Sequence, residues 1–296
     1  MIDLHERLSE FSYGYGVTRE VEKLLADTGI QSVPFLPSLV QEKQLGFDVA
    51  FNRPGVPLLL QFKLGQSLRR FVRTDKSFPA PPLGRPFWRF AVDTSEPNGQ
   101  FETLLAAEVY GAEVYYAAPR FSDWPRYAAA FEDGRVLDGS LLIRPSEIRA
   151  ALDSQGAPDG PHRIVYDNSR VHVCSRPARI SEIEPEVLAG KVAAKVRGEE
   201  RSLGSAIEGV FKSFFNRSEI RRTPNAVDQG FEADGPVRSL AVRASENLAN
   251  TERQRRVIDF RERAKSEEDA LAAVVGLELW ALGIQLILAV DFDTTS

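Results

Sequence analysis

Apolar and polar positions follow two different periods in the first 120 residues of the chain. Apolar residues at helical spacing between Thr18 and Gly29 predict a first helix, because Thr favours helix starts and Gly ends helices. Two apolar runs, residues 47–51 and 58–63, flank the turn sequence NRPGVP and predict a β-hairpin. The other elements predicted here are a strand within residues 31–40, a strand over 87–92, a helix over 100–110 and a strand over 113–118. Their order indicates an α/β unit.

The second half of the chain is predicted to be mixed and largely helical. A final helix begins at Ser266, where Asp269 completes a capping-box pattern, and ends at Gly283 before an apolar strand over 284–290. Two earlier strands are predicted over residues 136–143 and 163–174. The turn-rich stretch 153–161 between them is the best candidate boundary. We therefore expect a domain over residues 1–150 and an accessory α+β region over residues 151–296.

Composition limits the class of protein. Hydrophobic residues make up 43% and charged residues 27%, which suits a chain with a full core. The net charge of −5 argues against a strongly basic protein that coats nucleic acid. One cysteine, Cys174, and three histidines argue against a disulfide framework or a cysteine-based zinc site. No apolar run is long enough to span a membrane and no signal-peptide pattern is present, so we expect a cytoplasmic protein without membrane association.

Positive charge is concentrated in residues 63–89, which contain seven Lys or Arg residues and one acid, with aromatic residues between them. Such a segment either contacts a phosphate backbone or forms a solvated, proline-rich loop, and the sequence leaves both open. The candidate nucleic-acid-binding residues are Arg69, Arg70, Arg73 and Lys76.

Asp48, Gln61 and Lys63 are the candidate catalytic residues. In the predicted hairpin Asp48 lies on one strand, and alternation places Gln61 and Lys63 on one face of the other. A carboxylate, an amide oxygen and an ammonium group at one sheet edge suit a hard cation such as Mg²⁺, and the ammonium can offset charge that develops on a phosphate. The alternative is that Asp48 is a surface acid that pairs with Lys63.

These residues resemble the PD-(D/E)XK nuclease superfamily, and more closely its Mrr-like variants, in which Gln replaces the acid of the last motif. The superfamily core is helix, three strands, helix and strand, which is similar to the order predicted for residues 17–118. The resemblance therefore implies a restriction-endonuclease-like αβββαβ core. It also implies that Asp48 and Gln61 bind the metal and that Lys63 is the catalytic lysine.

The resemblance implies two auxiliary ligands as well. Glu20 of the first helix, in preference to Glu22, would be an auxiliary catalytic acid and metal ligand, and the carbonyl of Phe62 a further ligand. Because Gln61 is neutral, we expect one Mg²⁺ ion rather than two, with Mn²⁺ as a possible substitute. The chain departs from the superfamily pattern in that Phe47, and not proline, precedes Asp48.

By this resemblance the chain is expected to be a metal-dependent nuclease that hydrolyses phosphodiester bonds, of DNA rather than RNA. A role in restriction or antiphage defence is implied by the resemblance alone. The alternative is a catalytically inactive nucleic-acid-binding or assembly subunit on the same fold, and an RNase would differ only in substrate. The C-terminal region would bind substrate, a protein partner or a second copy of the chain.

Overall fold

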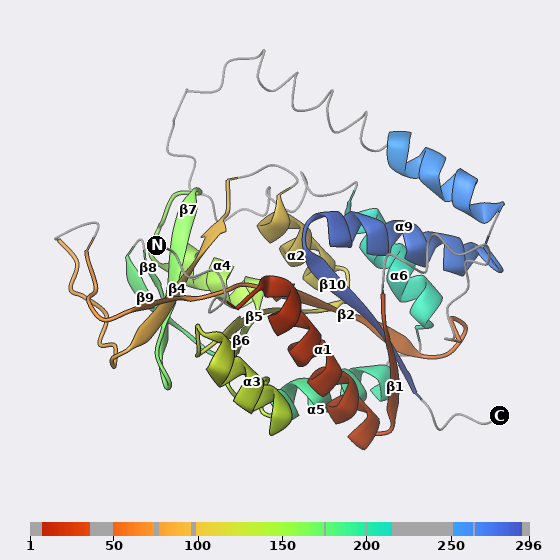
Figure 1. The fold of residues 1–296 in the computed structure, drawn as a ribbon. Coiled ribbons are helices and arrows are strands. Elements are labelled where there is room, and N and C mark those ends of the chain that lie inside the picture. The colour runs from red at the N-terminus through yellow and green to blue at the C-terminus, as the bar shows by residue number, and fades with distance from the viewer. Residues whose placement is uncertain are drawn as a thin grey trace, which may run out of the picture.

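The computed structural model describes residues 8–35, 50–73, 77–95, 99–174, 176–198, 201–214, 251–262 and 264–291. In these residues the chain is mixed α/β with two five-stranded sheets, which confirms the α/β class (Figure 1). The described helices are α1 (Glu10–Asp27), α2 (Gln100–Val109), α3 (Trp124–Glu132), α4 (Pro145–Ser154), α5 (Pro185–Gly198), α6 (Leu203–Ser213), a helix over 251–261, and α9 (Glu267–Ala281). The strands are β1 (Ile30–Pro34), β2 (Gly55–Phe62), β3 (Gln66–Leu68), β4 (Phe87–Asp93), β5 (Glu113–Pro119), β6 (Ser140–Ile143), β7 (Pro161–Tyr166), β8 (Val171–Cys174), β9 (Pro177–Ile180) and β10 (Ile284–Asp291).

The first sheet has the strand order β1-β10-β2-β5-β6. Strand β10 lies antiparallel between β1 and β2, whereas β2 and β5 are parallel and joined by a connection that contains α2. In this register Gln61 of β2 lies opposite Ile284 of β10 and Tyr116 of β5. The C-terminal ends of β2 and β5 therefore meet at the same end of the sheet.

Strand β2 is the central strand, and the alternation of its side chains separates two hydrophobic cores. Leu58 and Leu60 belong to the core beneath α1 and α5, whereas Leu59 belongs to the core beneath α2, α6 and α9. All three leucines are fully buried. Burial of each stabilises the fold by about 1.5–3 kcal/mol. Figure 1 shows the two helix layers on opposite faces of this sheet.

The second sheet has the order β3-β4-β7-β8-β9 and is antiparallel throughout. Its inner face packs into the core shared with α2 and α4, where the Phe90 ring lies 6.0 Å from that of Tyr116. The single strand predicted over 163–174 is wrong, because the chain turns between β7 and β8. The Asp167 carboxylate accepts the backbone N–H groups of Ser169 and Arg170, both at 2.8 Å, which stabilises this turn.

The hairpin predicted from residues 47–51 and 58–63 is also wrong. Both edges of β2 are already paired, one with β10 and the other with β5. Residues 51–53 form a turn before β2, closed by the Arg53 N–H, which donates to the Ala50 carbonyl. Local patterning could not reveal that a strand more than 200 residues away occupies the expected position.

The expected division into residues 1–150 and 151–296 does not match the sheet topology. A cut after residue 150 would remove β10 from between β1 and β2 in the first sheet and would separate β4 from β7 in the second. Among the described residues, no helix has both the length and the apolar character needed to cross a bilayer.

Candidate active site at the C-terminal end of β2

Gln61 is a buried polar residue near the end of an otherwise apolar strand. Its side chain is 2% exposed and lies on the α2 face of the sheet, the same face as Leu59. The amide Nε2 donates to the carbonyl of Phe62 at 3.0 Å, which orients the amide group. The other amide atom, Oε1, has no hydrogen-bond partner among the described residues. A buried acceptor in this state costs about 1–3 kcal/mol, so it marks a place where a ligand or water would be stabilising.

Lys63 follows Gln61 on the same face, and its backbone continues the ladder by donating to the Ala117 carbonyl at 2.9 Å. Its ammonium Nζ donates to Oε1 of Gln100 at 2.6 Å, and Nε2 of Gln100 donates to the carbonyl of Leu282. Gln100 therefore holds the lysine against the turn between α9 and β10. The side chain of Gln100 thus orients the ammonium group.

Gly283 brings the glutamines together at that turn. Its φ of +72° lies in the left-handed region, which Gly adopts without strain. A Cβ at this position would stand 3.8 Å from Nε2 of Gln61 and 3.8 Å from Nε2 of Gln100. Gln61, Lys63, Gln100 and the turn at Gly283 thus form one polar cluster, which we call the β2-end cluster.

Helix α2 begins within the β2-end cluster, because Gln100 is its first residue. Its N-cap residue is Gly99, which makes no side-chain capping bond. The first N–H groups of a helix carry partial positive charge and attract anions. The Lys63 ammonium and this helix terminus therefore lie at one place, and both favour a negatively charged group.

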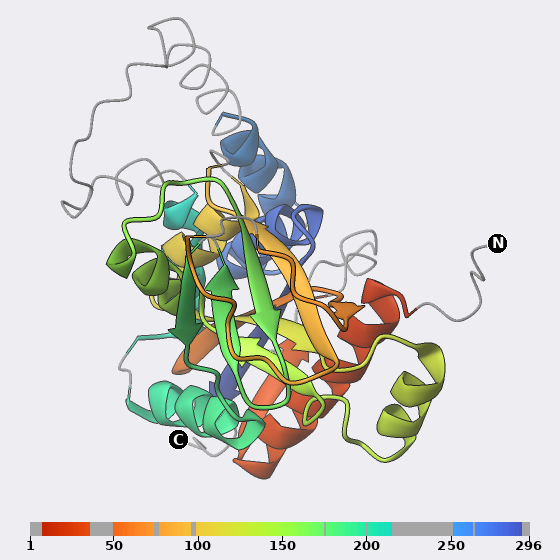
Figure 2. The same cartoon turned by 90° about the vertical axis from the view of Figure 1, so that its left-hand side faces the viewer.

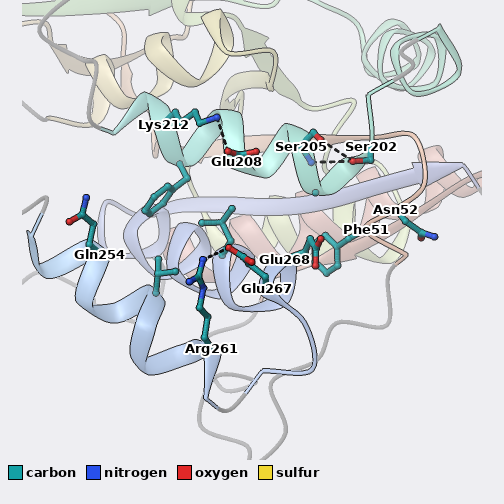
Figure 3. Close-up of a pocket in the computed structure, with 14 residues that line it drawn as sticks. Phe51, Asn52, Ser202, Ser205, Glu208, Lys212, Gln254, Arg261, Glu267 and Glu268 are labelled. Carbon is teal, nitrogen blue, oxygen red and sulfur yellow. Dashed lines mark hydrogen bonds and ion pairs between the residues drawn. The ribbon is translucent and has the colours of Figure 1, made fainter.

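Asp48 lies outside the described residues, so its expected approach to Gln61 and Lys63 is not described. The turn that follows it, at residues 51–53, lies at the N-terminal end of β2, whereas Lys63 follows the C-terminal end. Phe51 and Asn52 line a separate cavity of about 720 Å³ beside α6 and α9 (Figure 3). In that cavity Glu208 pairs with Lys212 and Glu267 pairs with Arg261.

Glu20 is not brought to the β2-end cluster. Its carboxylate accepts two backbone N–H groups, from Val136 at 3.0 Å and from Leu137 at 2.7 Å, in the connection between α3 and β6. Helix α1 packs on the face of the sheet opposite Gln61, as the contact of the Phe62 ring with Tyr13 shows. The structure thus gives Glu20 the role of fixing a loop, and not that of the auxiliary ligand predicted from the resemblance.

Glu22 and Phe62 line an apolar hollow of about 590 Å³ on the α1 face, together with Trp280 and Gly283. Burial raises the pKa of the Glu22 carboxyl above its usual value. The carbonyl of Phe62, a predicted metal ligand, is the acceptor for Gln61 Nε2. Of the two helical acids compared in the sequence, Glu22 is therefore the one that approaches the C-terminal end of β2.

The candidate nucleic-acid-binding residues Arg69, Arg70 and Arg73 are exposed and follow β3, while Lys76 lies outside the described residues. Within the described part of the chain, no group of three or more His, Cys, Asp or Glu side chains is placed to hold a metal ion. The sequence interpretation missed Gln100 and Gly283. Gln100 is distant in sequence from Lys63, and its only local signal is its position at a helix start.

Comparisons of the chain with models of protein families, with curated proteins and with solved structures found no match. The resemblance to the PD-(D/E)XK superfamily therefore rests on the residues of this chain.

Proposed function

We propose that the chain is a metal-dependent nuclease that hydrolyses phosphodiester bonds of nucleic acid, with DNA as the expected substrate, at the β2-end cluster. The observation that carries this proposal is the buried Oε1 atom of Gln61, which lacks a partner among the described residues. It is the atom that would bind a cation in a QxK site, and the lysine of that motif lies on the same face of β2.

The surroundings of Lys63 support a role at a phosphate. Gln100 holds its ammonium group beside the N-terminus of α2, so two sources of positive charge converge on one point. An ammonium group that is already oriented stabilises charge on a phosphate oxygen without reorganisation during the reaction. In this proposal Lys63 binds and neutralises the phosphate that is cleaved, and Gln100 is the positioning residue for Lys63.

The order of elements in the first sheet supports a restriction-endonuclease-like core. Helix α1 precedes β1 and β2, and α2 connects β2 to the parallel strand β5. The arrangement departs from the expected αβββαβ order in two respects. Strand β10 from the end of the chain lies between β1 and β2, and β3 and β4, which precede α2, belong to the second sheet. The proposed core is therefore completed by a strand from outside residues 17–118.

The implied Mg²⁺ ion would supply an activated water and a Lewis acid for the phosphate. The described residues fit this ion only in part: Gln61 Oε1 is an oxygen ligand, but no carboxylate cluster accompanies it. A hard cation in a protein usually requires at least one carboxylate. The resemblance assigns that carboxylate to Asp48, which lies outside the described residues. Because the turn that follows it lies at the opposite end of β2, the Asp48→Asn variant below tests this part of the proposal separately from Lys63.

The test is cleavage of plasmid, linear duplex and single-stranded DNA, and of RNA, with Mg²⁺, with Mn²⁺ and with EDTA. We expect the wild type to cleave one substrate class with metal, and Lys63→Ala and Asp48→Asn to lose cleavage while keeping their fold by circular dichroism. Lys212→Ala is the matched control, because Lys212 pairs with Glu208 on α6, away from the β2-end cluster. Metal-dependent cleavage that survives in Lys63→Ala would refute the assignment of the site.

The second candidate function is a nucleic-acid-binding or assembly subunit without catalytic activity. The engagement of the Glu20 carboxylate by Val136 and Leu137 favours this candidate, since one predicted ligand is used elsewhere. Salt-sensitive binding of nucleic acid together with no turnover in any metal would support it over the nuclease.

A further inference from the structure

The second sheet is basic in a chain that is acidic as a whole. Its segments, residues 66–93 and 161–180, contain ten Lys or Arg residues and three Asp or Glu residues, whereas the whole chain contains 37 and 42. Nine of those ten cations are arginines. Two segments far apart in the sequence thus contribute positive charge to one sheet, which a search for basic runs does not detect.

Three of these arginines lie on the outer face of this sheet. Trp88, Ile164 and Val173 point inward to the core, so their neighbours along each strand point outward. Arg89, Arg163 and Arg179 occupy such outward positions on β4, β7 and β9, and the last two are exposed. Figure 2 looks at the side of the molecule on which this sheet lies.

The proline-rich segment 77–86 lies along the same outer face. Arg176, after β8, stacks over the Phe78 ring at 5.4 Å, and Arg170, before β8, donates to the carbonyl of Pro82. The segment therefore runs along the length of β8. Its position explains why His172, which points outward, is nevertheless buried. The arginines of the second sheet and of the loops beside it are Arg69, Arg70, Arg73, Arg85, Arg89, Arg163, Arg170, Arg176 and Arg179, which we call the arginine layer.

Two exposed arginines of this layer, Arg70 and Arg179, differ from other exposed arginines of the chain in their surroundings. Neither Arg70 nor Arg179 has a carboxylate within ion-pair distance in the described part of the chain. Asp167, the buried acid of this sheet, is occupied by backbone N–H groups, including that of Gly84 at 2.6 Å. By contrast, the exposed arginines of α3 and its following loop, Arg126 and Arg135, each lie beside an aspartate.

We propose that the arginine layer binds the sugar-phosphate backbone of nucleic acid. Arginine presents a planar set of hydrogen-bond donors that matches a phosphate group. Its binding also releases the counterions that are condensed on the nucleic acid, which favours association. The edge strand of this sheet, β3, begins three residues after Lys63, so the sheet begins close to the β2-end cluster. This inference rests on the proposed function in that the bound strand would be the substrate of the nuclease. It adds Arg163, Arg170, Arg176 and Arg179 to the nucleic-acid interface.

The test measures binding of a fluorescently labelled DNA duplex in EDTA, where cleavage cannot occur, over 50–200 mM salt. Each lost phosphate contact makes the slope of log K against log salt less steep by about 0.9 for duplex DNA. We expect this change in Arg179→Gln and in Arg70→Gln, and about twice the change in the double variant. Arg126→Gln, a substitution of an exposed arginine on α3, is the matched control and is expected to keep the wild-type slope.

Wild-type slopes in both Arg179→Gln and Arg70→Gln, or binding of anionic lipid vesicles in place of DNA, would overturn the inference. A parallel cleavage assay with Mg²⁺ separates it from the proposed function. DNA binding that depends on Arg179 without any cleavage would refute the nuclease and support the arginine layer. Cleavage by the wild type with unchanged salt slopes in the variants would support the nuclease and refute the layer.

Discussion

Replacement of Glu20 by alanine distinguishes a structural role from a metal-binding role. In the structure the Glu20 carboxylate accepts the backbone N–H groups of Val136 and Leu137, at 3.0 and 2.7 Å. The side chains of Val136 and Leu137 are essentially fully buried, so these two N–H groups have little access to water once the carboxylate is removed. The resemblance to the nuclease superfamily instead implies that Glu20 binds metal and contributes to catalysis.

The size of the expected loss of stability follows from these two hydrogen bonds. A hydrogen bond to a charged group contributes about 1.5–3 kcal/mol, and two bonds to one carboxylate are not fully additive. We expect Glu20→Ala to lower the free energy of unfolding by about 3 kcal/mol. For a chain of this size each kcal/mol lowers Tm by about 2–4 °C, so the melting temperature should fall by roughly 6–12 °C.

Urea unfolding of the wild type, Glu20→Ala and Glu20→Gln measures this loss, with Glu132→Ala as the control at an exposed glutamate of α3. Glu20→Gln keeps one acceptor oxygen and should lose about half as much stability. Cleavage per folded molecule should be unchanged in both Glu20 variants. If Glu20→Ala were as stable as the wild type and had lost cleavage, Glu20 would be a catalytic ligand and its assignment to the α3–β6 loop would be wrong.

Three further predictions concern the sheet end and its supports. Gln100→Ala should lower kcat by about 10–100-fold, because the substitution removes the hydrogen-bond acceptor that orients the Lys63 ammonium group. An unchanged kcat would show that Lys63 is positioned without Gln100. Glu22→Gln should stabilise the protein at pH 7, because burial raises the pKa of the Glu22 carboxyl in the folded state. The wild type therefore loses stability as pH rises above 4.5, and the neutral variant does not. Urea unfolding at several pH values should show the gain of the variant vanishing below pH 4.5, and a gain that does not change with pH would contradict the argument. Gly65→Ala should destabilise by about 1–3 kcal/mol, because its Cβ would stand 2.2 Å from the Tyr166 hydroxyl, and a wild-type Tm would refute this.

Elements with strong local signals were predicted well, and those that depend on distant pairing were not. The final helix begins after Ser266, whose hydroxyl accepts the N–H of Asp269, and Gly283 follows its end as expected. These signals act within a few residues, so the sequence carries them locally. The hairpin prediction failed because nothing near β2 indicates that β10 pairs with it, although the apolar run of β10 is itself evident.

The candidate site illustrates why a motif predicts less than its residues suggest. Alternation along β2 correctly places Gln61 and Lys63 on one face, since that depends only on spacing within one strand. Whether Glu20 can join them depends on which face of the sheet α1 covers, and the spacing of residues does not determine this. The packing of Tyr13 against Phe62 puts α1 on the opposite face, so the acid of this helix is used in a loop while Gln100 of α2 approaches the lysine. A QxK motif therefore predicts the pair of residues on the strand, and the helices that pack on each face decide which side chains complete the site.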